Sequence, residues 1–399
     1  MSRIKKHLEH ADKKKLELLS FISFLFGFSQ AVLVYVIADY FKEAFGSTNV
    51  SVFYFLSYAV SLIGILNMHK IIKKMGKATT MFLFLFLQVC SVTFLIFSEP
   101  SLIGVFLLMA FIISSYLAWV MLDIIVEDYS EDKKSGRIRG LHLTVLNTGF
   151  LVGPLISTQI LEKFGFNGLF FVAMVISMFM FVVALLGLRS DNQRFGQNLT
   201  VRDLVKKIFV NKDVMKIYAV SLALEFFFAL MVVYTSLYLL EIGMSWSEIG
   251  IVFTIMLVPF VILGYPVGVL ADKKIGEKEM IIFGLVFMAF SSAAIFFITS
   301  TSVWVWSLVL FATRIGATII ETLRDSYFYK KIDGRDVDVI SFFRTTPSVA
   351  YISATAISAI TLIFFPLKSV FLIVAFASFF AIFAAVRLVD NKGEAEIRK

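Results

Sequence analysis

The chain has 399 residues, of which 59% are hydrophobic and 17% are charged, whereas soluble globular proteins average about 45–50% apolar and about 25% charged residues, so an ordinary soluble domain is excluded. One cysteine and four histidines exclude a disulfide-rich scaffold and leave too few soft ligands for a structural metal cluster, so we expect no metal and no cofactor. The net charge of +8 does not indicate a nucleic-acid partner, because the lysines and arginines fall between apolar runs and form no single patch.

Runs of about 20 apolar residues with few charges recur along the chain, and each is long enough to cross the roughly 30 Å core of a bilayer as a helix. The first six runs lie near residues 16–40, 50–68, 79–98, 101–126, 139–161 and 166–188. The second six lie near residues 214–240, 247–270, 279–299, 303–328, 338–363 and 367–388. The first run lacks a cleavage site of small residues, so we expect it to be retained. The pattern predicts an all-α integral membrane protein with 12 transmembrane helices.

A long polar stretch separates the two sets of runs and defines the domains. We expect a six-helix bundle over residues 1–188, a cytoplasmic linker over 189–213 and a second six-helix bundle over 214–399. Within the linker, residues 201–209 place apolar side chains at helical spacing opposite three basic ones. This pattern predicts an amphipathic helix in the inner headgroup layer, and a solvated linker helix is the alternative.

The basic residues predict the orientation, because lysine and arginine accumulate in cytoplasmic loops. If the N-terminus is cytoplasmic, every segment on that side carries several basic residues, among them Lys13, Lys70, Lys133, Arg202, Lys273 and Lys330. The outer loops carry only Lys42, Lys163 and Lys368. We therefore expect a multi-pass protein of the inner or plasma membrane with both termini in the cytoplasm.

The two halves also contain an internal repeat. At an offset of 198 residues, the aligned pairs are Asp123 with Glu321, Glu127 with Asp325, and Arg137 with Arg335. At an offset of 200 residues, the aligned pairs are Gly64 with Gly264 and Gly76 with Gly276. The matches fall in two pairs of corresponding loops. They predict a duplicated six-helix unit in parallel orientation, with a substrate site between the halves near the middle of the membrane.

The loop at residues 268–278 reads Gly-Val-Leu-Ala-Asp-Lys-Lys-Ile-Gly-Glu-Lys. It is similar to the signature loop of the major facilitator superfamily, which the chain resembles over essentially its whole length, with one extra residue before the second glycine. The counterpart in the first half keeps Lys73, Lys74 and Gly76 but has Ile72 where the family has aspartate. The resemblance implies a secondary transporter in which two pseudo-symmetric bundles rock around a central site.

Gly149, Gly153 and Pro154 on the fifth run are similar to the glycine–proline motif of that family's antiporters, although Ile, Ser and Thr at 156–158 replace the glycines that customarily follow. Small residues permit close helix approach and proline permits a bend. The resemblance therefore favours an antiporter.

Two charges lie deep in the second half. Glu225 and Arg314 each lie 11 residues beyond the start of a run, so both are about 16 Å deep, measured from opposite faces. A charge at mid-bilayer costs about 2.5–3.5 kcal/mol, which makes each a functional candidate, and the resemblance places both in the central cavity. We predict that Glu225 carries the coupling proton and that the approach of Arg314 drives its release. A permanent ion pair and substrate binding by Arg314 are the alternatives.

The first half contributes milder candidates to the same cavity, namely Gln30 and Tyr35 on the first run and Ser115 and Trp119 on the fourth. The two aromatic side chains are candidates to stack on a substrate, although aromatic residues in membrane helices more often pack. The family's drug exporters commonly carry an arginine in the fourth span, but the position aligned with Arg314 is Tyr116. This departure argues against a plain drug/proton antiporter.

Charges near the cytoplasmic surface are expected to form an inner gate that closes by salt bridges and opens when they break. The predicted gate residues are Asp123, Glu127, Arg137, Asp272, Lys273, Glu321, Arg324, Asp325, Arg335 and Arg344. The alternative is ordinary interfacial charge, which is exposed and contributes little.

Together these patterns predict a monomeric, proton-coupled exporter of small organic or amphipathic molecules. Uptake by symport, lipid or lysolipid flipping by the same fold, and sensing without transport are the alternatives. No Walker loop follows a strand pattern and no large soluble segment is present, so we expect neither an ATP-driven pump nor a membrane enzyme.

Overall fold

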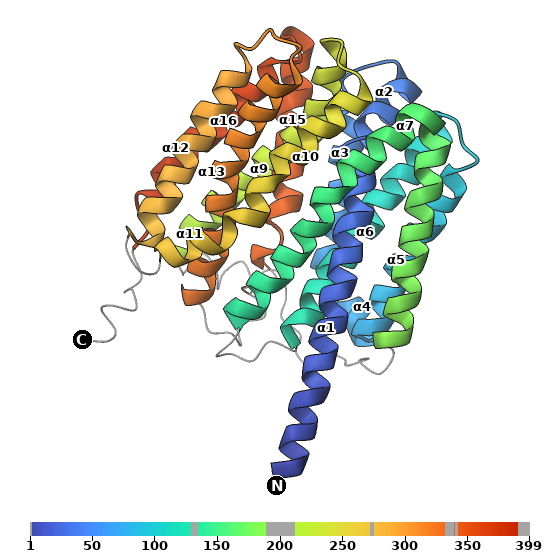
Figure 1. The fold of residues 1–399 in the computed structure, drawn as a ribbon, viewed down its shortest axis with the longest axis vertical. Helices are drawn as coiled ribbons and strands as arrows, with labels where there is room; N and C mark the ends of the chain where they lie inside the picture. Colours follow the sequence, from blue (N-terminus) through green and yellow to red (C-terminus); the bar gives the residue numbers. More distant parts are fainter. Residues whose placement is uncertain are drawn as a thin grey trace.

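A computed structural model describes the backbone of residues 2–128, 135–188, 212–271, 275–331, 339 and 342–389. It describes the side chains of residues 14–126, 144–188, 212–271, 275–328, 330–331, 339 and 342–389. Within this part of the chain every regular element is a helix (Figure 1). The sequence prediction of an all-α membrane fold is confirmed.

The described residues of the first half form seven helices, with bounds α1 Ser2–Leu33, α2 Ile37–Phe45, α3 Ser51–Leu66, α4 Met68–Met75, α5 Lys77–Leu95, α6 Leu102–Asp128 and α7 Ser135–Leu188. Within the described part of the second half there are seven more, with bounds α9 Lys212–Glu241, α10 Trp246–Ile262, α11 Gly264–Leu270, α12 Glu277–Ile295, α13 Val303–Lys331, α15 Thr346–Phe364 and α16 Ser369–Ala385. We call the end of the bundle at which α1 begins the terminal end, and the end at which α2 lies the far end (Figure 1).

By length and composition alone, the described helices account for fewer spans than the expected twelve. Among the described residues, 9 helical segments are long and apolar enough to span a membrane, or 10 when α3 and α4, bent by 56°, count as one. Helix α7 counts once, although non-helical backbone at Gly165 divides it. Helix α16, with 17 residues, is shorter than the length required of a span. The count of twelve therefore stays a prediction.

Three glycines set the path of the chain at turns that other residues adopt only with strain. At Gly165, with φ 65° and ψ −168°, α7 reverses its direction (Figure 1). Gly76 precedes α5 with φ 85° and ψ 163°, and Gly276 precedes α12 with φ 99° and ψ 154°. Because these last two glycines are aligned by the sequence repeat, their shared backbone geometry supports the duplication.

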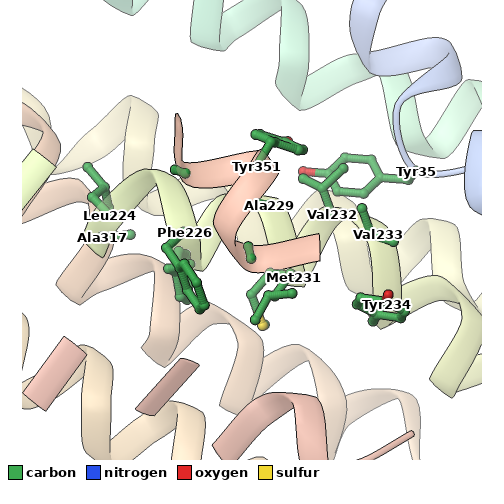
Figure 2. Close-up of a cluster of buried hydrophobic side chains, with 14 of the residues drawn as sticks. Tyr35, Leu224, Phe226, Ala229, Met231, Val232, Val233, Tyr234, Ala317 and Tyr351 are labelled. Carbon is green, nitrogen blue, oxygen red and sulfur yellow. The ribbon is translucent and has the colours of Figure 1, made fainter. Parts of the chain in front are cut away.

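Buried apolar side chains form two clusters, and their distribution differs between the ends of the bundle. One cluster lies wholly within the first half and runs from Leu19 to Leu188. The other runs through the second half and also takes in first-half residues at the far end, among them Tyr35, Phe41 and Phe53. Figure 2 shows Tyr35 beside side chains of the second half in this cluster. The halves thus share a core at the far end, whereas the first half has a core of its own toward the terminal end.

The glycines of the expected packing motif lie where α7 crosses α1. A β-carbon at Gly153 would lie 2.2 Å from the β-carbon of Ala31, and one at Gly149 would lie 2.5 Å from the carbonyl oxygen of Phe24. Pro154, inside α7, follows directly. The absence of side chains at these two positions lets the backbones of α1 and α7 approach closely.

The next turn of α7 contacts the second half. The Thr158 hydroxyl donates to the Pro154 carbonyl oxygen over 2.8 Å, and a β-carbon at Gly250 of α10 would lie 2.0 Å from the Thr158 hydroxyl oxygen. The segment around Pro154 therefore packs α7 against a helix of each half.

Candidate functional site

A cavity of about 240 Å³ lies between the halves and is lined by residues of both. The predicted cavity residues Gln30, Tyr35, Ser115, Trp119 and Glu225 all line it. Helices α1, α3, α6 and α7 contribute to one side, and α9, α10, α13 and α15 contribute to the other. The cavity thus lies where the repeat predicts a site.

Aromatic rings form much of the wall. Tyr58 of α3 and Tyr351 of α15 stack with their ring centroids 3.9 Å apart and their planes 18° apart. Tyr116 of α6 meets Tyr58 edge-on, with the centroids 5.5 Å apart, and its hydroxyl donates to the Arg344 carbonyl oxygen over 3.3 Å. The stack and this hydrogen bond join the two halves across the cavity.

Hydrogen bonds between neutral groups join the halves at the far end. The Tyr234 hydroxyl of α9 is 2.5 Å from the Ser51 hydroxyl of α3 and 3.0 Å from the Ser358 hydroxyl of α15. The Asn49 side-chain amide donates to the Ala359 carbonyl oxygen over 3.2 Å. We call these five residues the far-end cluster. It closes the interface between α3 and the second half.

A second far-end contact involves a helix N-terminus. The Glu162 carboxylate of α7 accepts a hydrogen bond from the Ser247 backbone N–H over 2.8 Å and another from the Ser247 hydroxyl. Ser247 lies in the first turn of α10, where N–H groups lack partners within the helix and a negative charge is favoured. A carboxylate of the first half therefore caps a helix of the second.

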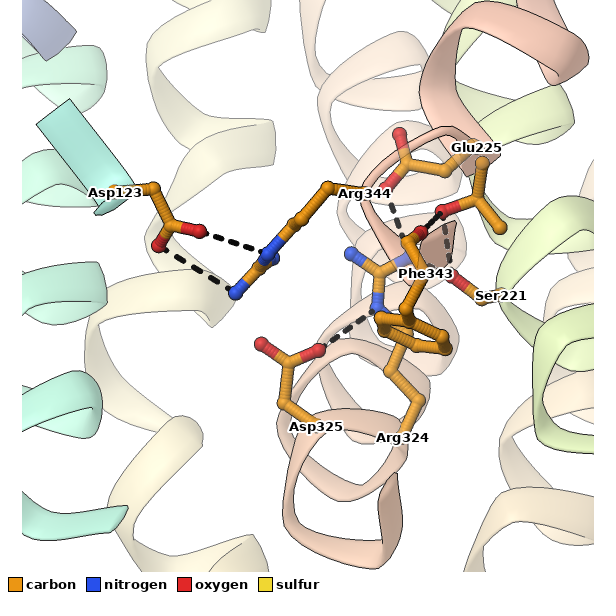
Figure 3. Close-up of polar contacts among 8 residues, drawn as sticks. Asp123, Ser221, Glu225, Arg324, Asp325, Phe343 and Arg344 are labelled. Atoms are coloured by element: carbon orange, nitrogen blue, oxygen red, sulfur yellow. Dashed lines mark hydrogen bonds and ion pairs between the residues drawn. The ribbon is translucent and has the colours of Figure 1, made fainter. Parts of the chain in front are cut away.

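Ion pairs lie in the wall of the cavity (Figure 3), and one of them involves Asp123, near the end of α6 that lies toward the terminal end. Asp123 of α6 forms an ion pair with Arg344, which precedes α15: Arg344 Nε is 2.8 Å from Asp123 Oδ2, and Arg344 Nη2 donates to Asp123 Oδ1 over 3.5 Å. In the second half, the Nη1 of Arg324 is 2.7 Å from Glu225 Oε1 and 2.8 Å from the Ser221 hydroxyl. The Nε of Arg324 is 3.6 Å from Asp325 Oδ1. One pair thus bridges the halves, and the other group ties α9 to α13.

The partner of Glu225 differs from the expected one. Glu225 pairs with Arg324, whereas the guanidinium of Arg314 lies 4.7 Å from the centroid of the Phe227 ring, donates to Thr313 over 3.3 Å and interacts with the Tyr35 hydroxyl. Arg314 is only 1% exposed and is not among the residues that line the cavity.

The depth estimate from the sequence compared positions along two helices, and depth alone does not decide which side chains of those helices face each other. Helix α13 continues to Lys331, so Arg324, about 15 Å further along the helix than Arg314, reaches Glu225 with its long side chain. The expected pair of Glu225 and Arg314 is therefore not formed in this conformation.

Of the expected gate residues, five lie in the cavity wall, and the side chains of the other five lie outside the described residues. Glu321, Arg324, Asp325, Asp123 and Arg344 all line the cavity, and Glu321 interacts with Arg324 and the Asn147 side chain. The expected residues that lie outside the described side chains are Glu127, Arg137, Asp272, Lys273 and Arg335. The proposed linker helix at 201–209 also lies outside the description.

Sequence reasoning missed several residues of the site. Tyr54 and Tyr58 are spaced by one helical turn and line the cavity together, and Tyr351 meets them from α15. That spacing was a usable signal, because residues four apart share a helix face. Asp39 of α2, 6% exposed within an apolar segment, is a buried acidic residue that was also missed, although it does not line the cavity.

The helices and the cavity together define a class of protein. Membrane-spanning helices in two halves surround a cavity that contains ionised side chains, and this arrangement is that of a secondary transporter. The family model described as Major Facilitator Superfamily matches residues 19–335 and 241–399, and the chain belongs to this family. Members of the family are transporters of small molecules and not enzymes. No curated protein matches the sequence.

Proposed function

We propose that this protein is a proton-coupled exporter of small organic or amphipathic molecules that works by alternating access. The observation that carries the proposal is the ion pair of Glu225 and Arg324 in the wall of the cavity between the halves. Keeping ionised groups inside a membrane protein is unfavourable unless they are paired, and such groups mark ion pathways.

The pair offers a physical means of coupling. While Glu225 is ionised, it holds Arg324 and so ties α9 to α13. Protonation of Glu225 removes that attraction, so that Arg324 keeps Asp325 of its own helix and is held to α9 only by its hydrogen bond to the Ser221 hydroxyl. Uptake and release of a proton then change how α9 and α13 are held together. Glu225 remains the proposed proton carrier, with Arg324 as its partner in this conformation.

Contacts at each end of the cavity supply the proposed gates. Asp123 and Arg344 bridge the halves on the terminal side, and the far-end cluster bridges them on the other. Alternating access requires one set to break while the other holds. We propose that the other expected gate residues act together with the pair of Asp123 and Arg344. These residues are Glu127, Arg137, Asp272, Lys273 and Arg335.

The remaining features of the proposal follow from the sequence. The accumulation of basic residues in the loops on the terminal side favours cytoplasmic termini in an inner or plasma membrane. We propose twelve crossings, with α7 providing two, a division into two bundles at residues 189–213, and a monomer as the working unit.

Transport in proteoliposomes tests the proposal. Compounds that raise the melting temperature of the purified protein are selected from a mixed library of drugs, sugars, amino acids and lysolipids. Each is then followed across the membrane under an imposed pH gradient. We expect the compound to move against the proton flow, and Glu225→Gln to abolish gradient-driven accumulation. Glu241→Gln, an exposed change at the end of the same helix, is the matched control.

The other outcomes of the assay identify the alternatives. Movement of compound and proton in the same direction would show an uptake symporter. Stabilisation by lysolipids alone, with their transfer between leaflets, would show a flippase, and saturable binding without flux would show a sensor. Full gradient-driven transport by Glu225→Gln would overturn the role of Glu225.

A further inference from the structure

The charges in the cavity wall are unequal. Among the described residues that line it, Asp123, Glu225, Glu321 and Asp325 are acidic and only Arg324 and Arg344 are basic. Each guanidinium already has carboxylate partners, since Arg344 pairs with Asp123 and Arg324 with Glu225 and Asp325. The described part of the wall therefore has two more carboxyl groups than guanidinium groups, which favours the entry of a cation over that of an anion.

Electron-rich rings surround the same space. Trp119 and the stacked pair of Tyr58 and Tyr351 line the cavity, together with Tyr35 and Tyr116. The faces of tryptophan and tyrosine rings attract cations, most strongly where water is excluded. The rings also provide flat apolar surface against which a planar ligand packs.

Polar atoms without partners point to a ligand as well. The Tyr54 hydroxyl, the Ser115 hydroxyl and the Gln30 amide nitrogen make no hydrogen bond to the described residues, although all three residues line the cavity. Tyr54 is 3% exposed and Ser115 is 2% exposed. Buried polar groups are nearly always hydrogen-bonded, so these atoms are suited to bind polar groups of a ligand.

We propose that the cavity binds flat organic monocations, held by the excess carboxylates and by the aromatic wall. This proposal rests on the proposed transport function and names its substrate class. It also fits exchange with protons, since a cation and a proton carry the same charge and both are favoured by the carboxylates of one cavity.

Isothermal titration calorimetry of the purified full-length protein, with each probe at the same pH, measures the binding affinities and so tests the preference of the cavity for a cation directly. The probes are 1-methyl-4-phenylpyridinium, a flat two-ring cation, and biphenyl-4-carboxylate, an anion of the same shape. We expect the cation to bind at least about tenfold more tightly than the anion. Equal or tighter binding of the anion, or no binding of either probe, would overturn the proposal.

Variants then locate the site. Glu321→Gln removes one excess carboxylate and is expected to weaken cation binding about tenfold, and Trp119→Leu is expected to weaken it several-fold. Glu241→Gln makes the same charge change on an exposed residue outside the cavity and is expected to have no effect. Unchanged affinity in both cavity variants would contradict the site. The comparison of the two probes on the unmodified protein needs no variant to fold.

Binding and transport fail separately in this design. If the cation binds but does not cross proteoliposome membranes, the cation site stands and the proposed function fails. If only neutral or anionic compounds bind and are driven across by a pH gradient, transport stands and the cation proposal fails.

Discussion

At the scale of single residues, Arg324 is central to the candidate site. It is 7% exposed, and its guanidinium contacts Glu225, Ser221 and Asp325 (Figure 3). Lysine would not reproduce this, because a guanidinium presents several donors in a fixed plane whereas an ammonium is a single charge. The site therefore depends on arginine in particular at this position.

We expect Arg324→Met to destabilise the protein by about 3–5 kcal/mol, because it leaves Glu225 in a poorly solvated wall without its partner. The measurement is the free energy of unfolding in mild detergent, from denaturant titration. The double variant Arg324→Met/Glu225→Gln removes both charges and should recover much of the loss. A double variant as unstable as the sum of the two single variants would contradict the pairing.

At the scale of elements, the crossing of α1 and α7 depends on two positions without side chains. The clash distances at Gly149 and Gly153 involve backbone atoms of α1, which do not move aside as the end of a flexible side chain does. The motif that the sequence assigned by resemblance thus has a local steric basis.

We expect Gly153→Ala to destabilise the protein by about 1–3 kcal/mol, since its methyl group overlaps Ala31 and forces the helices apart. Gly268→Ala is the matched control, because a β-carbon there meets only Thr322, at 4.0 Å. Thermal unfolding of the two variants and the parent, measured side by side, provides the comparison. Equal melting temperatures for both variants would show that α1 and α7 adjust without strain.

The elements also show how far sequence reasoning reaches. Apolar runs predicted the spanning helices, because burial in lipid requires length and low charge. The break between α1 and α2 at residues 34–36 was missed, since the apolar run continues through it. The partner of Glu225 was missed because the sequence indicates the position of a residue along its helix but not which faces of two helices meet. The stack of Tyr58 on Tyr351 joins residues far apart in the chain, and no local pattern records such a pairing.

At the scale of the whole molecule, the halves are joined by different chemistry at the two ends. The far-end cluster uses neutral hydroxyl and amide groups, while the terminal side uses the ion pair of Asp123 and Arg344. Each set of contacts favours a conformation in which its own end is closed.

We expect Tyr234→Phe to shift the protein toward opening at the far end, because it removes the hydroxyl that bonds to both Ser51 and Ser358 and leaves these two joined only by their direct contact of 3.3 Å. The loss of about 1 kcal/mol corresponds to roughly a fivefold change in the ratio of conformations. Spin-label distances between α2 and the start of α16 measure the far end, and those between α4 and α11 measure the terminal end.

Two further variants complete that experiment. Asp123→Asn should instead lengthen distances at the terminal end, since it weakens the bridge to Arg344. Tyr218→Phe is the matched control, because it removes a hydroxyl contact to Thr345 within the second half. The same distance distributions in Tyr234→Phe and in the parent would show that the far-end cluster does not hold the halves closed.

The unequal distribution of the two apolar clusters has a consequence for the order in which the protein folds during its synthesis. All members of one cluster lie between Leu19 and Leu188, so this cluster can form once the first half has been synthesised, whereas the far-end residues of the same half await the second half. The other cluster draws on residues as late as Leu388 and is completed only when synthesis is nearly finished. Because domains that emerge first also fold first, we expect α9 to α16 to assemble against the first half. The cavity between the halves then forms only when the last helices of the second half have folded.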